Sequence, residues 1–123
     1  TLSLHDALPI SLKKEKEFSM IYKKGQKKHT KYVIIIFLKN KLNEKRFGFV
    51  ASKKTGNAVN RNRIKRLFRE VVRLNTQEFK GNYDYILIGK SVLKDNISSL
   101  KYEDMEKDIL KGIKKWEKYL FYS

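Results

Sequence analysis

The sequence predicts an α+β fold in which helices pack on one side of a single β-sheet. Three apolar stretches have the length and the β-branched or aromatic composition of strands, at residues 32–38, 46–52 and 83–89. Charged stretches with helical spacing of their apolar residues lie between and around them. This order favours one layer of helices on one sheet. The 123 residues suit a single domain, since independent domains usually have about 100 to 200 residues.

Residues 12–24 are densely charged and are predicted to form a short helix. Phe18, Ile21 and Tyr22 have the i, i+3, i+4 spacing of one helix face, and Gly25 is a typical end. The two aromatic rings have two possible roles. Exposed rings would stack on unpaired bases beside a positive surface, whereas buried rings would only complete the core.

The next two apolar stretches are predicted to be strands that pair as a hairpin. Residues 32–38 read YVIIIFL, which suits a strand buried on both faces. Residues 46–52 read RFGFVAS and alternate, with Phe47 and Phe49 on one side. The polar residues 39–45 would form the turn.

The clearest helix follows this second strand. Its apolar residues lie at i, i+3, i+4, i+7 and i+8 and form one stripe: Ile64, Leu67, Phe68, Val71 and Val72. The rest of the helix carries six cations, with Glu70 as the interruption: Arg61, Arg63, Lys65, Arg66, Arg69 and Arg73. So positive a face repels itself unless an anion lies against it, and guanidinium groups match phosphate geometry. The pattern predicts a phosphate-binding surface rather than a merely solvated face.

The loop before this helix strengthens the prediction. Lys53 and Lys54 add two cations, and Asn57 can cap the helix with its side-chain oxygen. An uncovered helix start also favours a bound phosphate. Gly56 fits a plain turn as well as a functional role, and Asn62 either contacts RNA or satisfies the helix start.

The last two elements complete the predicted order of helix, hairpin, helix, strand and helix. Residues 83–89, YDYILIG, form a third strand. Residues 102–120 form a closing helix whose inward residues share one face: Met105, Ile109, Ile113, Trp116 and Leu120.

Composition and charge favour a folded protein with a polyanionic partner. Apolar residues make up 41% of the chain, which is enough for one core. The 29 Lys and Arg outnumber the 13 Asp and Glu, for a formal net charge of +16 and a pI near 10.0. Nucleic acid is favoured over a membrane as the partner, because no stretch has the ~18 continuous apolar residues that a span requires.

The sequence also argues against several kinds of active site. It contains no cysteine, which removes disulfides, zinc–thiolate sites and thiol catalysis and fits a cytoplasmic location. His5 and His29 are the only histidines, too few for a histidine metal cluster. The acidic residues show no clustered metal-binding motif. No catalytic residue and no metal ligand is therefore predicted in this chain.

Residues 1–11, TLSLHDALPIS, differ from the rest of the chain. They include no Lys or Arg and contain the one Pro. They lack the basic start and the long apolar run of a signal peptide. The string resembles one reading frame of a sequencing adapter translated into protein, so we expect a disordered, non-native leader. The single domain is expected to comprise residues 12–123.

The stretch 49–70, FVASKKTGNAVNRNRIKRLFRE, resembles the signature of the bacterial ribonuclease P protein subunit. The matching residues keep their spacing through the loop and the basic helix: Lys53, Lys54, Gly56, Asn57, Ala58, Val59, Arg61, Asn62, Arg63, Lys65, Arg66 and Arg69. LKKEKEF at the front and KYVIIIF at the first strand also agree, so the resemblance covers residues 12 to about 120.

The resemblance implies a fold and a function. The fold would be that of the second domain of a small-subunit ribosomal protein, with a left-handed βαβ crossover that places the basic helix beside the sheet. The protein would be the non-catalytic subunit of an endoribonuclease that removes the 5′ leader of precursor tRNA, with the chemistry performed by an RNA subunit that binds Mg²⁺. Its partners would be that RNA and precursor tRNA, with one protein in a cytoplasmic ribonucleoprotein and no DNA or membrane partner.

The resemblance also implies which residues bind. Those expected to contact the catalytic RNA and help to secure metal near its active centre lie in the loop and basic helix: Lys53, Lys54, Asn57, Arg61, Asn62, Arg63, Lys65, Arg66 and Arg69. Phe18, Tyr22, Ile36 and Lys53 would line a cleft for the leader, between the first helix and the sheet. Tyr22 stands where the family often has Phe, and Ile36 stands where some members have an aromatic residue.

Three alternatives remain. A generic RNA-binding or ribosome-associated module would share the charge and the helix, and a cleavage assay would distinguish it. A DNA reader of the helix-turn-helix kind is weaker, since the basic helix follows a strand. A stand-alone nuclease is weaker still, because no acidic metal motif accompanies the basic helix.

Overall fold

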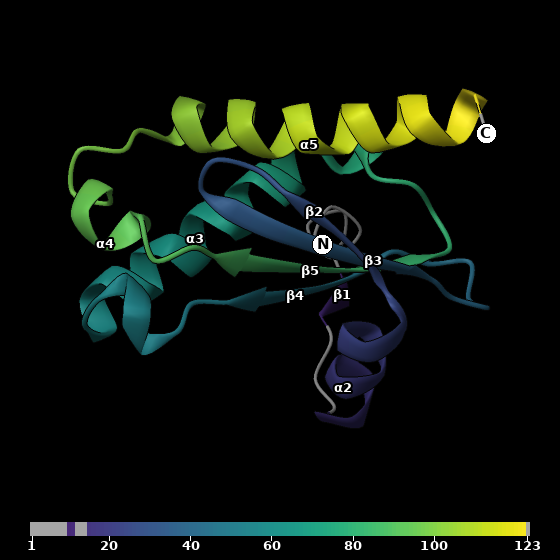
Figure 1. The fold of residues 1–123 in the computed structure, drawn as a ribbon, viewed down its shortest axis with the longest axis horizontal. Helices are drawn as coiled ribbons and strands as arrows, with labels where there is room; N and C mark the ends of the chain where they lie inside the picture. The colour runs from purple at the N-terminus through teal and green to yellow at the C-terminus, as the bar shows by residue number, and fades with distance from the viewer. Residues whose placement is uncertain (1–9, 12–14, 123) are drawn as a thin grey trace, which may run out of the picture.

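The computed structural model describes the backbone of residues 10–11 and 15–122 and the side chains of residues 15–114, and these form one mixed sheet with helices on it (Figure 1). The predicted α+β class is confirmed. In chain order the elements are β1 (Ile10–Ser11), α2 (Glu15–Lys24), β2 (Gln26–His29), β3 (Val33–Lys39), β4 (Arg46–Val50), the 3₁₀ turn η1 (Lys53–Thr55), α3 (Ala58–Leu74), the 3₁₀ turn η2 (Thr76–Glu78), β5 (Tyr83–Gly89), α4 (Leu93–Asn96) and α5 (Tyr102–Tyr122).

The strand order is β1-β4-β5-β3-β2. Strands β4 and β5 run parallel and are joined through α3, whereas β3 is antiparallel to β5. The predicted hairpin between residues 32–38 and 46–52 is therefore wrong, because β5 lies between those two strands. Five of the seven residues of β5 are buried, so a central place in the sheet shields it better than an edge would.

The hairpin in the structure is β2–β3, with Gln26 opposite Phe37 and His29 opposite Ile34. Strand β2 reads QKKH and has no apolar residue, so it carries no strand pattern of its own. Its pairing depends on β3, and a polar, basic edge strand is a common protection against edge-to-edge association.

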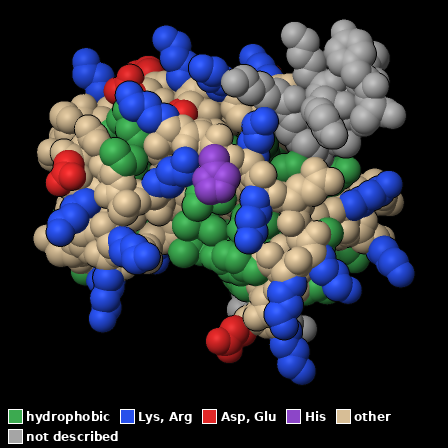
Figure 2. All heavy atoms as spheres, in the orientation of Figure 1, with side chains coloured by type: hydrophobic (Ala, Val, Ile, Leu, Met, Phe, Trp, Pro, Cys, Tyr) green, Lys and Arg blue, Asp and Glu red, His purple; other side chains and the backbone are tan. Residues whose placement is uncertain are grey.

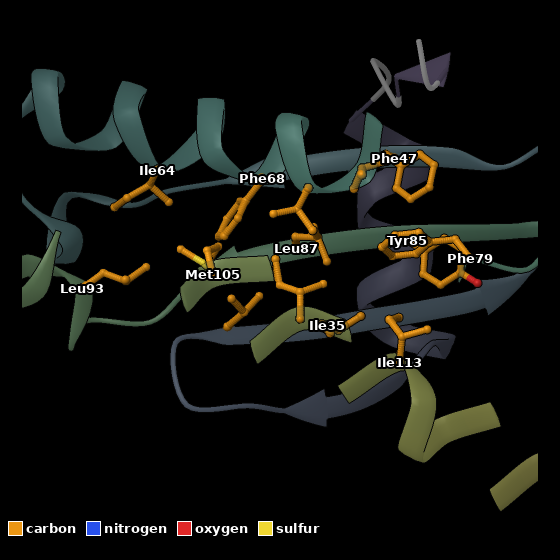
Figure 3. Close-up of a cluster of buried hydrophobic side chains, with 14 of the residues drawn as sticks. Ile35, Phe47, Ile64, Phe68, Phe79, Tyr85, Leu87, Leu93, Met105 and Ile113 are labelled. Carbon is orange, nitrogen blue, oxygen red and sulfur yellow. The ribbon is translucent and has the colours of Figure 1, made fainter. Parts of the chain in front are cut away.

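The main core lies between the sheet and helices α3 and α5 (Figure 3). Phe47 stacks on Tyr85 with ring centroids 5.3 Å apart, and Phe79 meets both rings edge-on. The predicted stripe of α3 is confirmed, since Ile64, Phe68, Val71 and Val72 are fully buried and Leu67 is partly buried. Met105, Ile109 and Ile113 of α5 are buried as predicted, while the side chains of Trp116 and Leu120 lie outside the described residues.

Helix α2 packs on the opposite face of the sheet, so the prediction that all helices lie on one side is corrected. The reason is in β3, whose alternate residues Ile34 and Ile36 are also apolar and need cover. Ile21 of α2 forms a small second core with Ile36 and Ile86. Gly25 permits this close approach, because a Cβ there would lie 2.5 Å from the Ile21 carbonyl oxygen and 2.8 Å from Cγ2 of Ile36.

A partly buried ion-pair network fixes α2 to the sheet. Arg46 of β4 donates from Nε and Nη2 to the two carboxylate oxygens of Asp84, each at 2.8 Å, and also forms an ion pair with Glu17 of α2. Asn40 donates to the same Asp84 carboxylate at 2.8 Å. The hydrogen bonds that Arg46 donates to Asp84 are the main reason that the pKa of Arg46 is raised. The network therefore joins α2, β4 and β5.

Of the predicted leader, residues 1–11, the structure describes the backbone of Ile10 and Ser11. Ile10 and Ser11 pair in parallel with Arg46 and Phe47 at the β4 edge. Residues 1–9 and 12–14 lie outside the described residues. Within the described chain, no helix is both long enough and apolar enough to cross a membrane.

Candidate RNA interface

The start of α3 is held by a side-chain cap. Asn57 has an extended backbone, and its side-chain oxygen accepts a hydrogen bond from the backbone N–H of Asn60 at 2.9 Å. In the loop before it, the buried Thr55 donates its hydroxyl proton to the Ser52 carbonyl at 2.6 Å. Lys53 and Lys54 thus extend from a loop with a defined shape.

Removing this cap has a predictable cost. Asn57→Ala is expected to lower the free energy of unfolding by about 1 kcal/mol, because the N–H of Asn60 loses its acceptor. Urea denaturation measures the loss. Asn62→Ala is the matched control, since Asn62 is exposed and is expected to change stability by less than about 0.5 kcal/mol. Equal losses for the two variants would show that Asn57 is not the cap.

The predicted RNA-binding cations gather on one surface, which we call the α3 surface. Lys53, Lys54, Arg66 and Arg69 are exposed, and Arg61 and Lys65 are partly exposed. In the part of the chain that the structure describes, none of these six cations forms an ion pair; the three pairs found there join Arg46 to Glu17, Arg46 to Asp84, and Arg73 to Glu70. The α3 surface is therefore a set of cations without internal counter-charges, which is the arrangement that binds phosphate groups.

Two arginines of this helix have further contacts that the sequence did not indicate. Arg63 is exposed, yet its Nε and Nη2 donate to the carbonyl oxygens of Ile97 and Leu100, both at 3.3 Å. The Arg69 guanidinium lies over the Phe49 ring, 5.9 Å from its centroid. Arg63 thus ties α3 to the segment between α4 and α5, and its replacement would disturb more than charge.

The residues predicted to bind the 5′ leader of precursor tRNA differ in their exposure to solvent. Phe18 is partly buried against the second core, and Tyr22 is 37% exposed, with partial burial raising its pKa. Lys53 is exposed on η1. Ile36 is 1% exposed, so the expectation that it faces the leader is corrected. Its side chain is covered because Ile21 packs onto it from α2.

Beside α2, a row of partly exposed residues offers the apolar surface that the buried Ile36 cannot offer. The row crosses the sheet through paired positions, from Val50 of β4 through Ile88 of β5 and Ile34 of β3 to His29 of β2. The three aliphatic residues are only partly buried. Figure 2 shows apolar side chains in a hollow between the histidine and α2. We call this feature the sheet groove. The alternation of side chains along β3 could have indicated that Ile34 lies on this face. The rest of the row could not be predicted, because it depends on strand pairing between segments distant in sequence.

The α+β scaffold and the unpaired α3 surface define a small basic RNA-binding protein. The family model described as Ribonuclease P matches residues 9–117. The ribonuclease P protein component of Fusobacterium nucleatum is 54% identical over 99 residues, covering 80% of this chain and 89% of that protein. The one from Natranaerobius thermophilus is 39% identical over 106 residues, covering 86% and 89%.

Solved structures agree with these sequence relatives. The ribonuclease P protein of Thermotoga maritima superposes with a TM-score of 0.80 at 27% identity, over 85% of this chain and 96% of that one. The Staphylococcus aureus protein has a TM-score of 0.75 at 30% identity, over 85% and 92%. The chain belongs to the bacterial ribonuclease P protein family. It is the protein component of an enzyme that matures the 5′ end of tRNA, and catalysis in that enzyme is by RNA.

Proposed function

We propose that the α3 surface binds the ribonuclease P RNA and that the sheet groove binds the unpaired 5′ leader of precursor tRNA. The observation that carries the first half is that, among residues 15–114, no ion pair engages Lys53, Lys54, Arg61, Lys65 or Arg66. Each such cation that neutralises a phosphate releases a condensed counterion, and that release drives binding. Arginine adds a planar donor fork that fits phosphate oxygens.

The second half is supported by the chemistry of the groove. Its floor is apolar and partly exposed, through Val50, Ile88 and Ile34. Unpaired bases stack without sequence preference on an exposed aromatic ring such as that of Tyr22, while their phosphates face nearby cations. Lys53 begins η1, three residues after the groove residue Val50 ends β4, and α3 is the next element after η1 in the chain. One RNA strand could therefore pass from the catalytic RNA into the groove.

Leader binding is tested at Tyr22, which is exposed enough to change without disturbing the core. Tyr22→Ala is expected to weaken binding of precursor tRNA to the reconstituted enzyme about 5- to 160-fold, since stacking on one aromatic ring contributes about 1 to 3 kcal/mol. Tyr22→Phe keeps the ring and is expected to bind normally. Mature tRNA, which has no leader, should bind both variants and the wild type equally. An equal loss for precursor and mature tRNA would contradict leader binding by the groove.

Mg²⁺ is proposed to be held mainly by the RNA subunit. The described residues contain no group of three or more His, Asp or Glu side chains placed to hold a metal ion, and the cations of the α3 surface repel Mg²⁺. The chain contributes instead by neutralising phosphates, so that the folded RNA needs less Mg²⁺. We further infer that one copy of the protein acts in each cytoplasmic ribonucleoprotein.

A further inference from the structure

A second group of lysines lies where the β2–β3 turn meets α5, away from the α3 surface. Two neighbouring hollows occupy this junction, with volumes of about 280 Å³ and 250 Å³. Both are lined by Lys31 and Lys111; Lys28 lines the first and Lys107 lines the second. We call these four residues the lysine site. Figure 2 shows Lys and Arg side chains on both sides of the histidine that borders it.

The floor of the lysine site is built from fixed contacts. The Asp108 carboxylate of α5 accepts three hydrogen bonds from the turn, from the Thr30 hydroxyl at 2.6 Å, the Lys31 N–H at 3.0 Å and the Tyr32 N–H at 2.9 Å. Gly112 lets the turn approach the helix, because a Cβ there would lie 2.6 Å from Cγ2 of Thr30. The turn and the helix therefore hold a defined concave shape.

The two acidic residues at this junction, Asp104 and Asp108, are fewer than its four lysines and form no ion pair with them among the described residues. Asp108 is engaged by the turn, and Asp104 accepts a hydrogen bond from the Lys101 N–H at the start of α5. No ion pair involving Lys28, Lys31, Lys107 or Lys111 occurs among residues 15–114. The junction therefore carries excess positive charge next to a hollow, which favours an anionic ligand.

The lysine site adjoins the sheet groove at its far end. His29 closes the apolar row at the β2 edge and also lines the first hollow. Lys28, the preceding residue of β2, points to the α5 side, where its Cγ lies near Gly112. A strand of RNA that enters the groove near Lys53 and crosses the sheet would therefore leave it over β2, beside the lysine site.

We propose that the lysine site binds phosphates of the 5′ leader upstream of the nucleotides held in the sheet groove. This inference rests on the proposed function, since it requires a leader in the groove. The proposal makes the affinity for precursor tRNA depend on leader length. Short leaders end within the groove, whereas longer leaders also contact the lysine site.

The test compares precursor tRNAs with leaders of about 4 and about 16 nucleotides, the range that single-strand sites of this size cover. The enzyme is reconstituted with Lys31→Gln/Lys111→Gln, which removes the two lysines common to both hollows. Its affinity for the long-leader precursor is expected to fall about 10- to 25-fold at roughly 0.1 M salt, and the salt slope to become shallower by about 1.4, as for two lost phosphate contacts. Affinity for the short-leader precursor should not change.

Lys39→Gln/Lys41→Gln is the matched control, because it removes the same charge at two exposed lysines at the opposite end of β3. It should bind both precursors as the wild type does. Unchanged binding of the long leader by the lysine-site variant, or an equal loss for both leaders, would overturn the proposal. Tyr22→Ala separates the two ideas. If it leaves short-leader binding intact, the groove assignment fails, and the proposal for the lysine site fails with it. If it weakens short-leader binding while the lysine-site variant binds the long leader normally, only the lysine site fails.

Discussion

Replacing Arg61 and Arg66 with glutamate is expected to lower the affinity for ribonuclease P RNA about 25- to 60-fold at roughly 0.1 M salt. Each lost phosphate contact removes about 0.7 to 0.9 from the slope of log affinity against log salt, so two contacts account for that range. Both arginines lie off the buried stripe of α3, and neither forms an ion pair within the described chain. Binding measured over a salt series reports the affinity and the slope together.

Arg61 and Arg66 are chosen because replacing them should change the charge of the α3 surface without removing a contact that supports the fold. Arg63 would be a poorer choice, since its hydrogen bonds to Ile97 and Leu100 hold α3 against the α4–α5 segment. The matched control is Lys39→Glu/Lys41→Glu, which makes the same change in net charge away from α3. Wild-type binding by the Arg61/Arg66 variant would show that the α3 surface does not hold the RNA. An equal loss in the control would show that overall charge, and not the α3 surface, attracts the RNA. Circular dichroism checks that the variant is folded.

Asp84→Ala is expected to lower the free energy of unfolding by about 3 kcal/mol. Asp84 is 1% exposed and accepts hydrogen bonds from Arg46 and Asn40, so its loss leaves a largely buried guanidinium without its main counter-charge. Removing one partner of a buried pair costs about 3 to 5 kcal/mol. The lower end applies here because 17% of the Arg46 side chain is accessible and Glu17 remains as a second partner. Urea denaturation measures the change.

The exposed pair of Arg73 and Glu70 provides the control. Their side chains are 36% and 41% accessible, so Glu70→Ala is expected to cost less than about 1 kcal/mol. A similar small cost for Asp84→Ala would mean that the Arg46 network does not hold the sheet together. Arg46 also contacts Glu17 of α2, so the loss of Asp84 should loosen the hold of the sheet on α2, which lies beside the sheet groove. The folded Asp84→Ala protein should therefore bind precursor tRNA more weakly while binding the RNA subunit normally.

What the sequence could predict follows from how local each signal is. The stripe from Ile64 to Val72 and the cations around it depend only on helical spacing, so α3 and its surface were predictable. Strand order depends on pairing between distant segments, so neither the place of β5 between β3 and β4 nor the polar strand β2 could be predicted.

In the candidate site, too, local features were predictable and features that depend on distant contacts were not. Asn57 was recognised as a cap from its type and position, and the structure confirms its hydrogen bond to Asn60. Ile36 was assigned to the leader by position alone, but its exposure depends on how α2 lies on the sheet. The contacts of Arg63 were hidden because their acceptors are main-chain carbonyls over 30 residues away in sequence.

The most direct test of this account is cleavage of precursor tRNA by a bacterial ribonuclease P RNA at low Mg²⁺, with and without this protein. We expect rapid cleavage at the mature 5′ end when RNA and wild-type protein are combined, little cleavage with the RNA alone, none with the protein alone, and a strong loss with Arg61→Glu/Arg66→Glu. Cleavage by the protein alone, or equal stimulation by wild type and variant, would contradict a non-catalytic subunit that docks through α3.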